Sequence, residues 1–164
     1  MAKSLREQIN KTTPFASAEE EAMLNIARTA SMIDGVERAF FKRFDLSSPA
    51  YNLLRILRGH LQRGEELGVR ASEIGGQMVV RMPDVTRLVD RMEERGLVER
   101  GTSSEDKRVK YVRITKNGMK LLEQIDPEIL DLGRSILGHM SPTELEQVSR
   151  LLEKARNEEQ RGGA

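Results

Sequence analysis

The chain has 164 residues, of which 38% are hydrophobic and 32% charged, and its formal net charge is +1. This suits one domain with a sizeable core and long exposed helical faces, and the near-neutral total argues neither for nor against nucleic acid. The lack of cysteine excludes a disulfide framework, a thiolate zinc site and a thiol-based redox switch.

The N-terminal part of the chain predicts one long helix over residues 17–44. Ser17 and Glu20 form a capping-box pattern, with Ser17 as N-cap and Glu20 reaching back. Apolar residues follow at helical spacing, namely Met23, Ile26, Ala27, Ala30, Ile33, Phe40 and Phe44. No apolar run reaches membrane-spanning length and no hydrophobic signal core is present, so we expect a cytoplasmic protein with no membrane partner.

A second helix is predicted from Ser48 as N-cap, with Pro49 at its first helical position. Its broad apolar face consists of Leu53, Leu54, Ile56, Leu57 and Leu61. A loop over residues 63–68 ends it, and Glu65 is interpreted as loop charge.

The centre of the chain predicts an extended piece and two short helices. The first helix spans about residues 72–78 and contains Gly75 and Gly76, which a close approach of another helix would explain. Pro83 opens the second helix, and Gly96 ends it as a left-handed cap. The buried stripe of this second helix is Val85, Leu88, Val89 and Met92.

A β-hairpin and two further helices complete the prediction. Strand-like runs at residues 97–100 and 109–115 flank a polar link. Residues 100–116 hold six Lys or Arg against two Asp or Glu, so positive charge is concentrated here. Thr115 caps a long helix that Pro127 must kink or interrupt, and a capping box at Ser141 and Glu144 begins the last helix.

The order short helix, turn, helix, β-hairpin is that of a winged helix-turn-helix, whose second helix enters the DNA major groove. Arg87 on that helix suits bidentate hydrogen bonding to guanine, and Thr86 suits a base edge or phosphate. Acids in the C-terminal half of the helix can pair with arginines and leave its start positive. The exposed face of the helix consists of Asp84, Thr86, Arg87, Asp90 and Arg91.

Two segments resemble the MarR (multiple-antibiotic-resistance regulator) family of winged helix-turn-helix transcription factors. They are VTRLVDRMEERGLVER at residues 85–100 and EDKRVKYVRITKNG at residues 105–118. The resemblance implies an obligate homodimer joined by the first helix and the last two. It also implies that Arg108 probes the minor groove from the wing, with Asp106 holding it. Two departures are Gly75-Gly76 and Arg81, which stands where the family has a small polar residue.

The predicted fold is mostly α with a small β-hairpin wing, a winged helix-turn-helix with flanking dimerisation helices. Residues 1–47 are the N-terminal arm and first dimerisation helix, 48–115 the DNA-binding domain and 116–164 the C-terminal dimerisation helices. The apolar outer helices favour a two-fold dimer, although they can also pack on each other within one chain. Basic residues expected to contact phosphate include Arg81, Lys107, Arg108 and Lys110, and Arg91 is expected to contact DNA from the recognition helix.

The function expected is that of a sequence-specific transcriptional repressor that binds a pseudo-palindromic operator in double-stranded DNA. The alternative is a winged-helix protein-interaction module without DNA, which the polar recognition face disfavours. No enzyme motif is present, and no cofactor is expected. His60 and His139 lack the spacing of zinc ligands, so a helix-end or surface role is favoured and no metal is expected.

A small aromatic or anionic effector is the remaining expectation, because the family resemblance implies a ligand between the dimer helices and the winged domain. Residues that could line such a cleft are Phe40, Phe44, Tyr51 and Arg55. The alternative, that the aromatic rings are simply core, is favoured over a ligand site.

Overall fold

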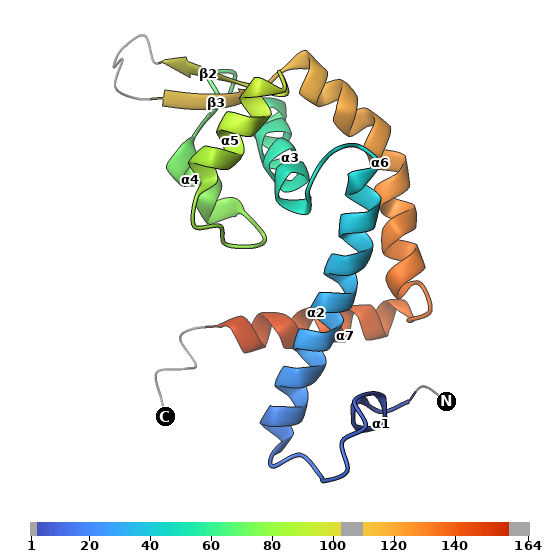
Figure 1. Ribbon diagram of the computed structural model, residues 1–164. Coiled ribbons are helices and arrows are strands. Elements are labelled where there is room, and N and C mark those ends of the chain that lie inside the picture. Colours follow the sequence, from blue (N-terminus) through green and yellow to red (C-terminus); the bar gives the residue numbers. More distant parts are fainter. Residues whose placement is uncertain (1–2, 103–109, 158–164) are drawn as a thin grey trace. The chain divides into compact units, whose positions relative to one another are not determined.

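The computed structural model describes residues 3–102 and 110–157, in two compact units, 1–119 and 120–164 (Figure 1). The first unit contains α1 (Leu5–Gln8), α2 (Ala18–Lys42), α3 (Ser48–Gln62), β1 (Val69–Arg70), α4 (Ala71–Gln77), α5 (Val85–Glu94), β2 (Val98–Thr102) and β3 (Lys110–Ile114). α6 (Lys116–Leu137) begins in it, and α7 (Pro142–Arg156) lies wholly in the second. The predicted fold class is confirmed. None of the helices described could cross a membrane.

The three strands form one antiparallel sheet in the order β1-β3-β2. β2 and β3 are the predicted hairpin, with Val98 opposite Ile114, and β1 adds a third strand with Val69 opposite Val112. Gly68, directly before β1, has φ +93°, and a Cβ there would lie 2.4 Å from the Val112 carbonyl oxygen. Only glycine fits this close approach, so Gly68 sets the path by which the extended piece joins the sheet.

The core of the first unit lies where α3, α4 and α5 meet the sheet. The buried side chains of α5 are Leu88, Val89 and Met92, as its predicted stripe requires, whereas Val85 is only half-buried. The Leu97 amide donates to the Met92 carbonyl at 2.9 Å after Gly96 turns the chain with φ +67°. This left-handed end of α5 is the cap that the sequence predicts.

Two helix starts differ from the prediction, that of α3 by one residue and that of α5 by two. The N-cap of α3 is Ser47, whose hydroxyl accepts from the Ala50 amide at 3.3 Å, while the Ser48 hydroxyl donates to Glu37. The N-cap of α5 is Asp84, so Pro83 precedes the helix instead of opening it. In both cases the cap is the residue whose side-chain oxygen accepts from the third helical amide.

The outer helices begin largely as predicted. Ser17 caps α2, but the Glu20 carboxylate accepts from the Ala16 amide, so the capping box is incomplete. The box of Ser141 with Glu144 is complete. α6 runs unbroken through Pro127, so the proline does not interrupt the helix, and the alternative of a kink stays a prediction. The proline removes one amide donor, so the carbonyl one turn earlier, that of the exposed residue Glu123, loses its helical hydrogen bond.

Both ends of the chain carry apolar side chains that their own unit leaves exposed. In α2 these are Met23, Leu24, Ile26 and Met32. No side chain of α7 is buried, and Leu151 is 62% exposed. Amphipathic helices with exposed apolar faces of this kind require a partner surface.

Candidate nucleic-acid interface

The start of α5 is organised by Asp84. One oxygen of its carboxylate accepts from the Arg87 amide at 3.0 Å, and the other lies 3.0 Å from Arg87 Nε. The Arg87 side chain is 85% exposed. Asp84 therefore caps the helix and also holds the Arg87 side chain at Nε. The two terminal amino groups of the guanidinium are not part of this contact.

Three residues of the predicted recognition face are exposed, and Asp84 and Asp90 are half-buried. Thr86, Arg87 and Arg91 are all exposed. A shallow depression of about 490 Å³ next to them is lined by Met82, Pro83, Asp84, Arg87, Asp90 and Arg91. Arg81, in the turn before α5, is exposed as well. The structure thus places these predicted contact residues along one short stretch of chain.

Two acids of α5, Asp90 and Glu93, pair with Arg100 of β2, whose single positive charge cancels one of their two negative charges. One terminal nitrogen of the guanidinium lies 2.5 Å from Asp90 and the other pairs with Glu93, whose carboxylate also accepts from the Arg100 amide at 3.0 Å. Desolvation by partial burial acts to lower the pKa of Arg100, but the hydrogen bonds and charges of Asp90 and Glu93 outweigh it and raise the pKa above its ordinary value. The expected pairing of these acids with an arginine is confirmed.

Arg95 links the end of α5 to the corner between α2 and α3. Its guanidinium donates to the Asp45 carbonyl at 2.5 Å and lies 3.3 Å from the Asp45 carboxylate. Asp45 has φ +51°, an uncommon backbone conformation that aspartate tolerates better than most residues. The sequence gives no signal for this pair, because the two residues are 50 positions apart.

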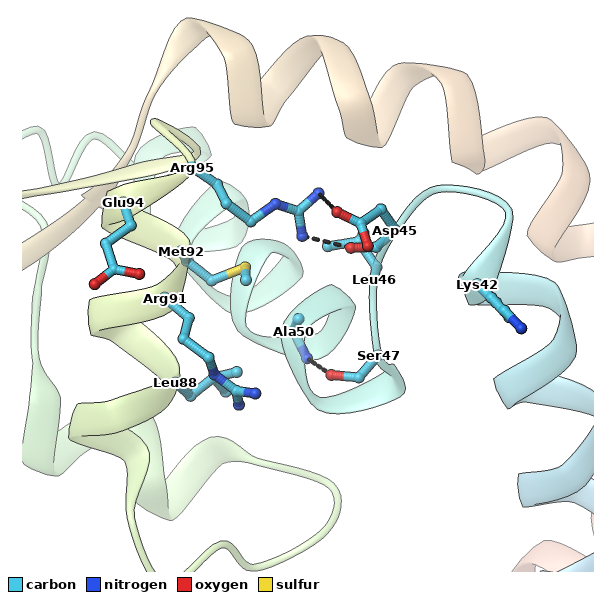
Figure 2. A pocket seen from close by; sticks show the side chains of 10 residues that line it. All are labelled: Lys42, Asp45, Leu46, Ser47, Ala50, Leu88, Arg91, Met92, Glu94 and Arg95. Carbon is cyan, nitrogen blue, oxygen red and sulfur yellow. Dashed lines mark hydrogen bonds and ion pairs between the residues drawn. The ribbon is translucent and has the colours of Figure 1, made fainter.

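A cavity of about 380 Å³ lies beside the Asp45–Arg95 pair (Figure 2). Its apolar lining is Leu46, Ala50, Leu88 and Met92, and its polar and charged lining is Lys42, Asp45, Ser47, Arg91, Glu94 and Arg95. Figure 2 shows the two dashed contacts from Arg95 to Asp45, and Arg91 coming from the helix that Arg95 ends. An apolar floor with cations at its edge suits a ligand that has an apolar body and a negative group.

The aromatic residues predicted as a ligand cleft each pack on another aromatic ring, Phe40 on Phe44 and Tyr51 on Phe41. Ring centroids are 5.4 Å apart for Phe40 and Phe44 and 4.7 Å apart for Phe41 and Tyr51. Phe40 and Tyr51 are buried, and the Arg55 guanidinium lies 5.8 Å from the Tyr51 ring centroid. These contacts are those of a core, and a ligand cleft at these residues stays a prediction.

The wing is described only at its base. Lys110 is exposed at the start of β3, and Arg113 pairs with Glu99 across the hairpin at 2.8 Å. The predicted wing residues Asp106, Lys107 and Arg108 lie outside the described residues.

His60 is buried at the end of α3, 8% exposed, so a helix-end position is confirmed and a surface position is wrong. Its Nδ1 lies 2.6 Å from the Glu65 carboxylate and its Nε2 lies 3.0 Å from the Gln77 side-chain oxygen. The hydrogen bond from His60 lowers the pKa of Glu65, which is therefore more than loop charge. Over the part of the chain that is described, no three His, Asp or Glu side chains gather as metal ligands would.

Comparison with known proteins gives a consistent result. The MarR family model matches residues 46–110. The HTH-type transcriptional repressor IacR of Pseudomonas putida is 31% identical over 112 residues, which span 68% of this chain and 64% of that protein. A MarR transcription factor from Planctomyces limnophilus shares 35% identity and a TM-score of 0.64, covering 85% of this chain and 98% of its own. A mutant MarR from E. coli, complexed with operator DNA, has 20% identity and a TM-score of 0.71, covering 94% and 100%.

Proposed function

Since the chain belongs to the MarR family of transcription factors, we propose that it is a cytoplasmic repressor that binds operator DNA as a homodimer, without catalysis. Residues 48–115 form the DNA-binding domain, and residues 1–47 and 116–164 supply the dimerisation helices. The observation that carries the proposal is the start of α5. Asp84 holds the exposed Arg87 there, and farther along the helix Arg100 pairs with Asp90 and Glu93 and cancels one of their two negative charges.

Charge is the reason for preferring DNA to a protein partner at α5. A recognition helix must present donors to base edges without repelling phosphate. Asp90 and Glu93 would repel phosphate most strongly if they were unpaired, and Arg100 reduces this repulsion by pairing with both. Arg87, Thr86 and Arg91 then remain as the groups nearest the groove. The operator-bound E. coli MarR has the same fold, which supports this use of the helix.

Dimerisation follows from the uncovered outer helices. The exposed apolar side chains of α2 and α7 are best buried by the same helices of a second copy, because two-fold symmetry covers both sets at once. Two recognition helices then face successive turns of DNA, and the operator is a pseudo-palindrome with half-sites about 10 base pairs apart.

Relief of repression is assigned to the cavity beside Arg95. A small carboxylate with an aromatic or aliphatic body would place its charge near Lys42 and Arg91 and its body on Leu88. Such a ligand competes with Asp45 for Arg95 and so weakens the ion pair that joins the end of α5 to the corner between α2 and α3. A panel of aromatic carboxylates tests this. At least one should release bound DNA, and Lys42→Ala should raise the concentration required.

Selection from a random duplex library at near-physiological salt tests the main proposal. We expect enrichment of one pseudo-palindrome by the wild-type protein. Asp84→Asn, which keeps an N-cap, should retain that preference with weaker binding, while Arg87→Ala should lose it at one position per half-site. A folded protein that enriches no sequence contradicts DNA binding and favours the interaction module.

A further inference from the structure

Two valines stand exposed in the turn that leads into the recognition helix. The turn spans residues 78–84, between α4 and α5, and is the loop below these helices in Figure 1. Val79 is 85% exposed and Val80 is 65% exposed. The exposed fraction of Val79 is the largest for any large hydrophobic side chain in the described residues. The polar recognition face of α5 does not explain why either valine is exposed.

The backbone of the turn is held at both ends while these side chains remain in water. Met78 is buried, and the Val79 amide donates to the side-chain oxygen of Asn52, in α3, at 2.9 Å. At the other end Asp84 caps α5. Valine also has few side-chain rotamers to lose, so a contact made by this pair carries a small entropic cost. The turn is therefore a pre-organised apolar projection.

The surroundings of the two valines favour DNA as the occupant. Arg81 follows them directly, and Arg87 and Arg91 lie on the first turns of α5. A protein partner for an apolar projection would be better served by a contiguous apolar patch, whereas the adjoining depression is lined by two Arg and two Asp besides Met82 and Pro83. In the major groove, one apolar group lies among polar base edges beside phosphate, and that group is the C5-methyl of thymine.

We propose that Val79 and Val80 read thymine C5-methyl groups at the edge of each half-site, and that Asn52 is the residue that positions them. This inference rests on the proposed function, because it requires α5 to enter the major groove. It adds an apolar element of specificity to the hydrogen bonds of Arg87. Asn52 acts through the Val79 amide and need not touch DNA itself.

Deoxyuridine scanning tests the proposal, because replacing thymine by uracil removes only the methyl group and preserves base pairing. The duplex enriched by the library selection is resynthesised with each thymine replaced in turn, in both half-sites together. Loss of one methyl contact per half-site should weaken wild-type binding about fourfold per half-site. The Val79→Ala/Val80→Ala double variant should bind thymine and uracil duplexes equally.

Arg87→Ala is the matched control, because it should weaken binding while retaining the thymine-to-uracil ratio. Asn52→Ala should reduce that ratio, and Asn52→Asp, which keeps the acceptor for the Val79 amide, should restore it at least partly. Circular dichroism checks that each variant is folded. A general loss of stability would lower both affinities and leave their ratio unchanged.

Three results are distinguishable. If no duplex is enriched, the proposed function fails and this inference fails with it. If a duplex is enriched but no thymine-to-uracil replacement changes the affinity of the wild-type protein, only the inference is overturned. Val79 and Val80 would then be expected to contact a protein partner. A wild-type ratio that persists in the double variant also overturns it, because another residue then reads the methyl.

Discussion

Arg100 shows how one side chain from a neighbouring strand changes the charge of the recognition helix. It joins β2 to α5 through Asp90 and Glu93, with its side chain 25% exposed. The acids in α5, and their tendency to pair with arginines, could be predicted from the sequence. Which arginine would do so could not, because the pairing depends on how the hairpin packs against the helix, and helical periodicity says nothing of that.

We expect Arg100→Ala to lower the free energy of unfolding by about 1 kcal/mol, since the partners are half-exposed and water screens the pair. DNA affinity should fall further, because Asp90 and Glu93 would then repel phosphate. Adding Glu93→Gln should recover part of that affinity. Urea unfolding and binding titrations measure the two effects. An unchanged affinity in folded Arg100→Ala would mean that these acids lie away from DNA.

His60 and Glu65 give a prediction about pH. The hydrogen bond from His60 lowers the pKa of Glu65 from its ordinary value of 4.5 on folding. The stability contributed by this carboxylate is therefore present above pH 4.5 and is lost as the pH falls through the lowered value. Glu65→Gln should unfold more easily than wild type at pH 7, and the difference should shrink as the pH falls through the lowered pKa of Glu65. A difference independent of pH contradicts this assignment.

At the scale of elements, most helices and the hairpin could be predicted because their signals are local. Hydrophobic spacing placed α2, α3 and α5, and the glycine at residue 96 placed the end of α5. The errors have a tertiary origin. Whether Ser47 or Ser48 caps α3 depends on Glu37, which engages the Ser48 hydroxyl. The pairing of β1 depends on the approach of Gly68 to Val112.

The explanation expected for Gly75 and Gly76, a close approach of another helix, is a further error at the scale of elements. A Cβ at Gly75 would meet Val85 at 3.5 Å, an ordinary contact, and one at Gly76 would meet nothing within 4 Å. The expected close helix approach therefore does not require glycine at either position. Nothing in the structure explains the pair.

The outer helices give a prediction about assembly. Leu151 is 62% exposed on α7, and Val148, one turn before it, is 41% exposed. If a second copy buries these side chains, Leu151→Glu places a charge in an apolar interface and should shift the protein toward monomer. Ser149→Glu, at an exposed site of the same helix that faces away from Val148 and Leu151, is the matched control and should leave the dimer intact. Sedimentation of wild type as a monomer at micromolar concentration would contradict the dimer itself.

At the scale of the whole molecule, the formal net charge is +1, but positive charge is unevenly distributed and is concentrated in residues 100–116. Exposed Arg81, Arg91 and Lys110 are present in each subunit, and a dimer doubles them. If the dimer neutralises roughly 6–10 phosphates, affinity should fall on the order of 10³–10⁵-fold between 50 and 200 mM salt. Titrations over that range measure the slope. A flat response would be incompatible with a phosphate-contacting surface.

Dimethyl sulfate footprinting on the selected duplex tests the central claim most directly, because the reagent modifies guanine N7 in the major groove, where Arg87 is expected to bind. The account predicts two protected clusters about 10 base pairs apart and related by two-fold symmetry. Arg87→Ala, at a concentration that restores occupancy, should lose protection at one guanine per half-site and keep the rest. Absence of guanine N7 protection at full occupancy, or a footprint that Arg87→Ala leaves unchanged, would contradict recognition through α5.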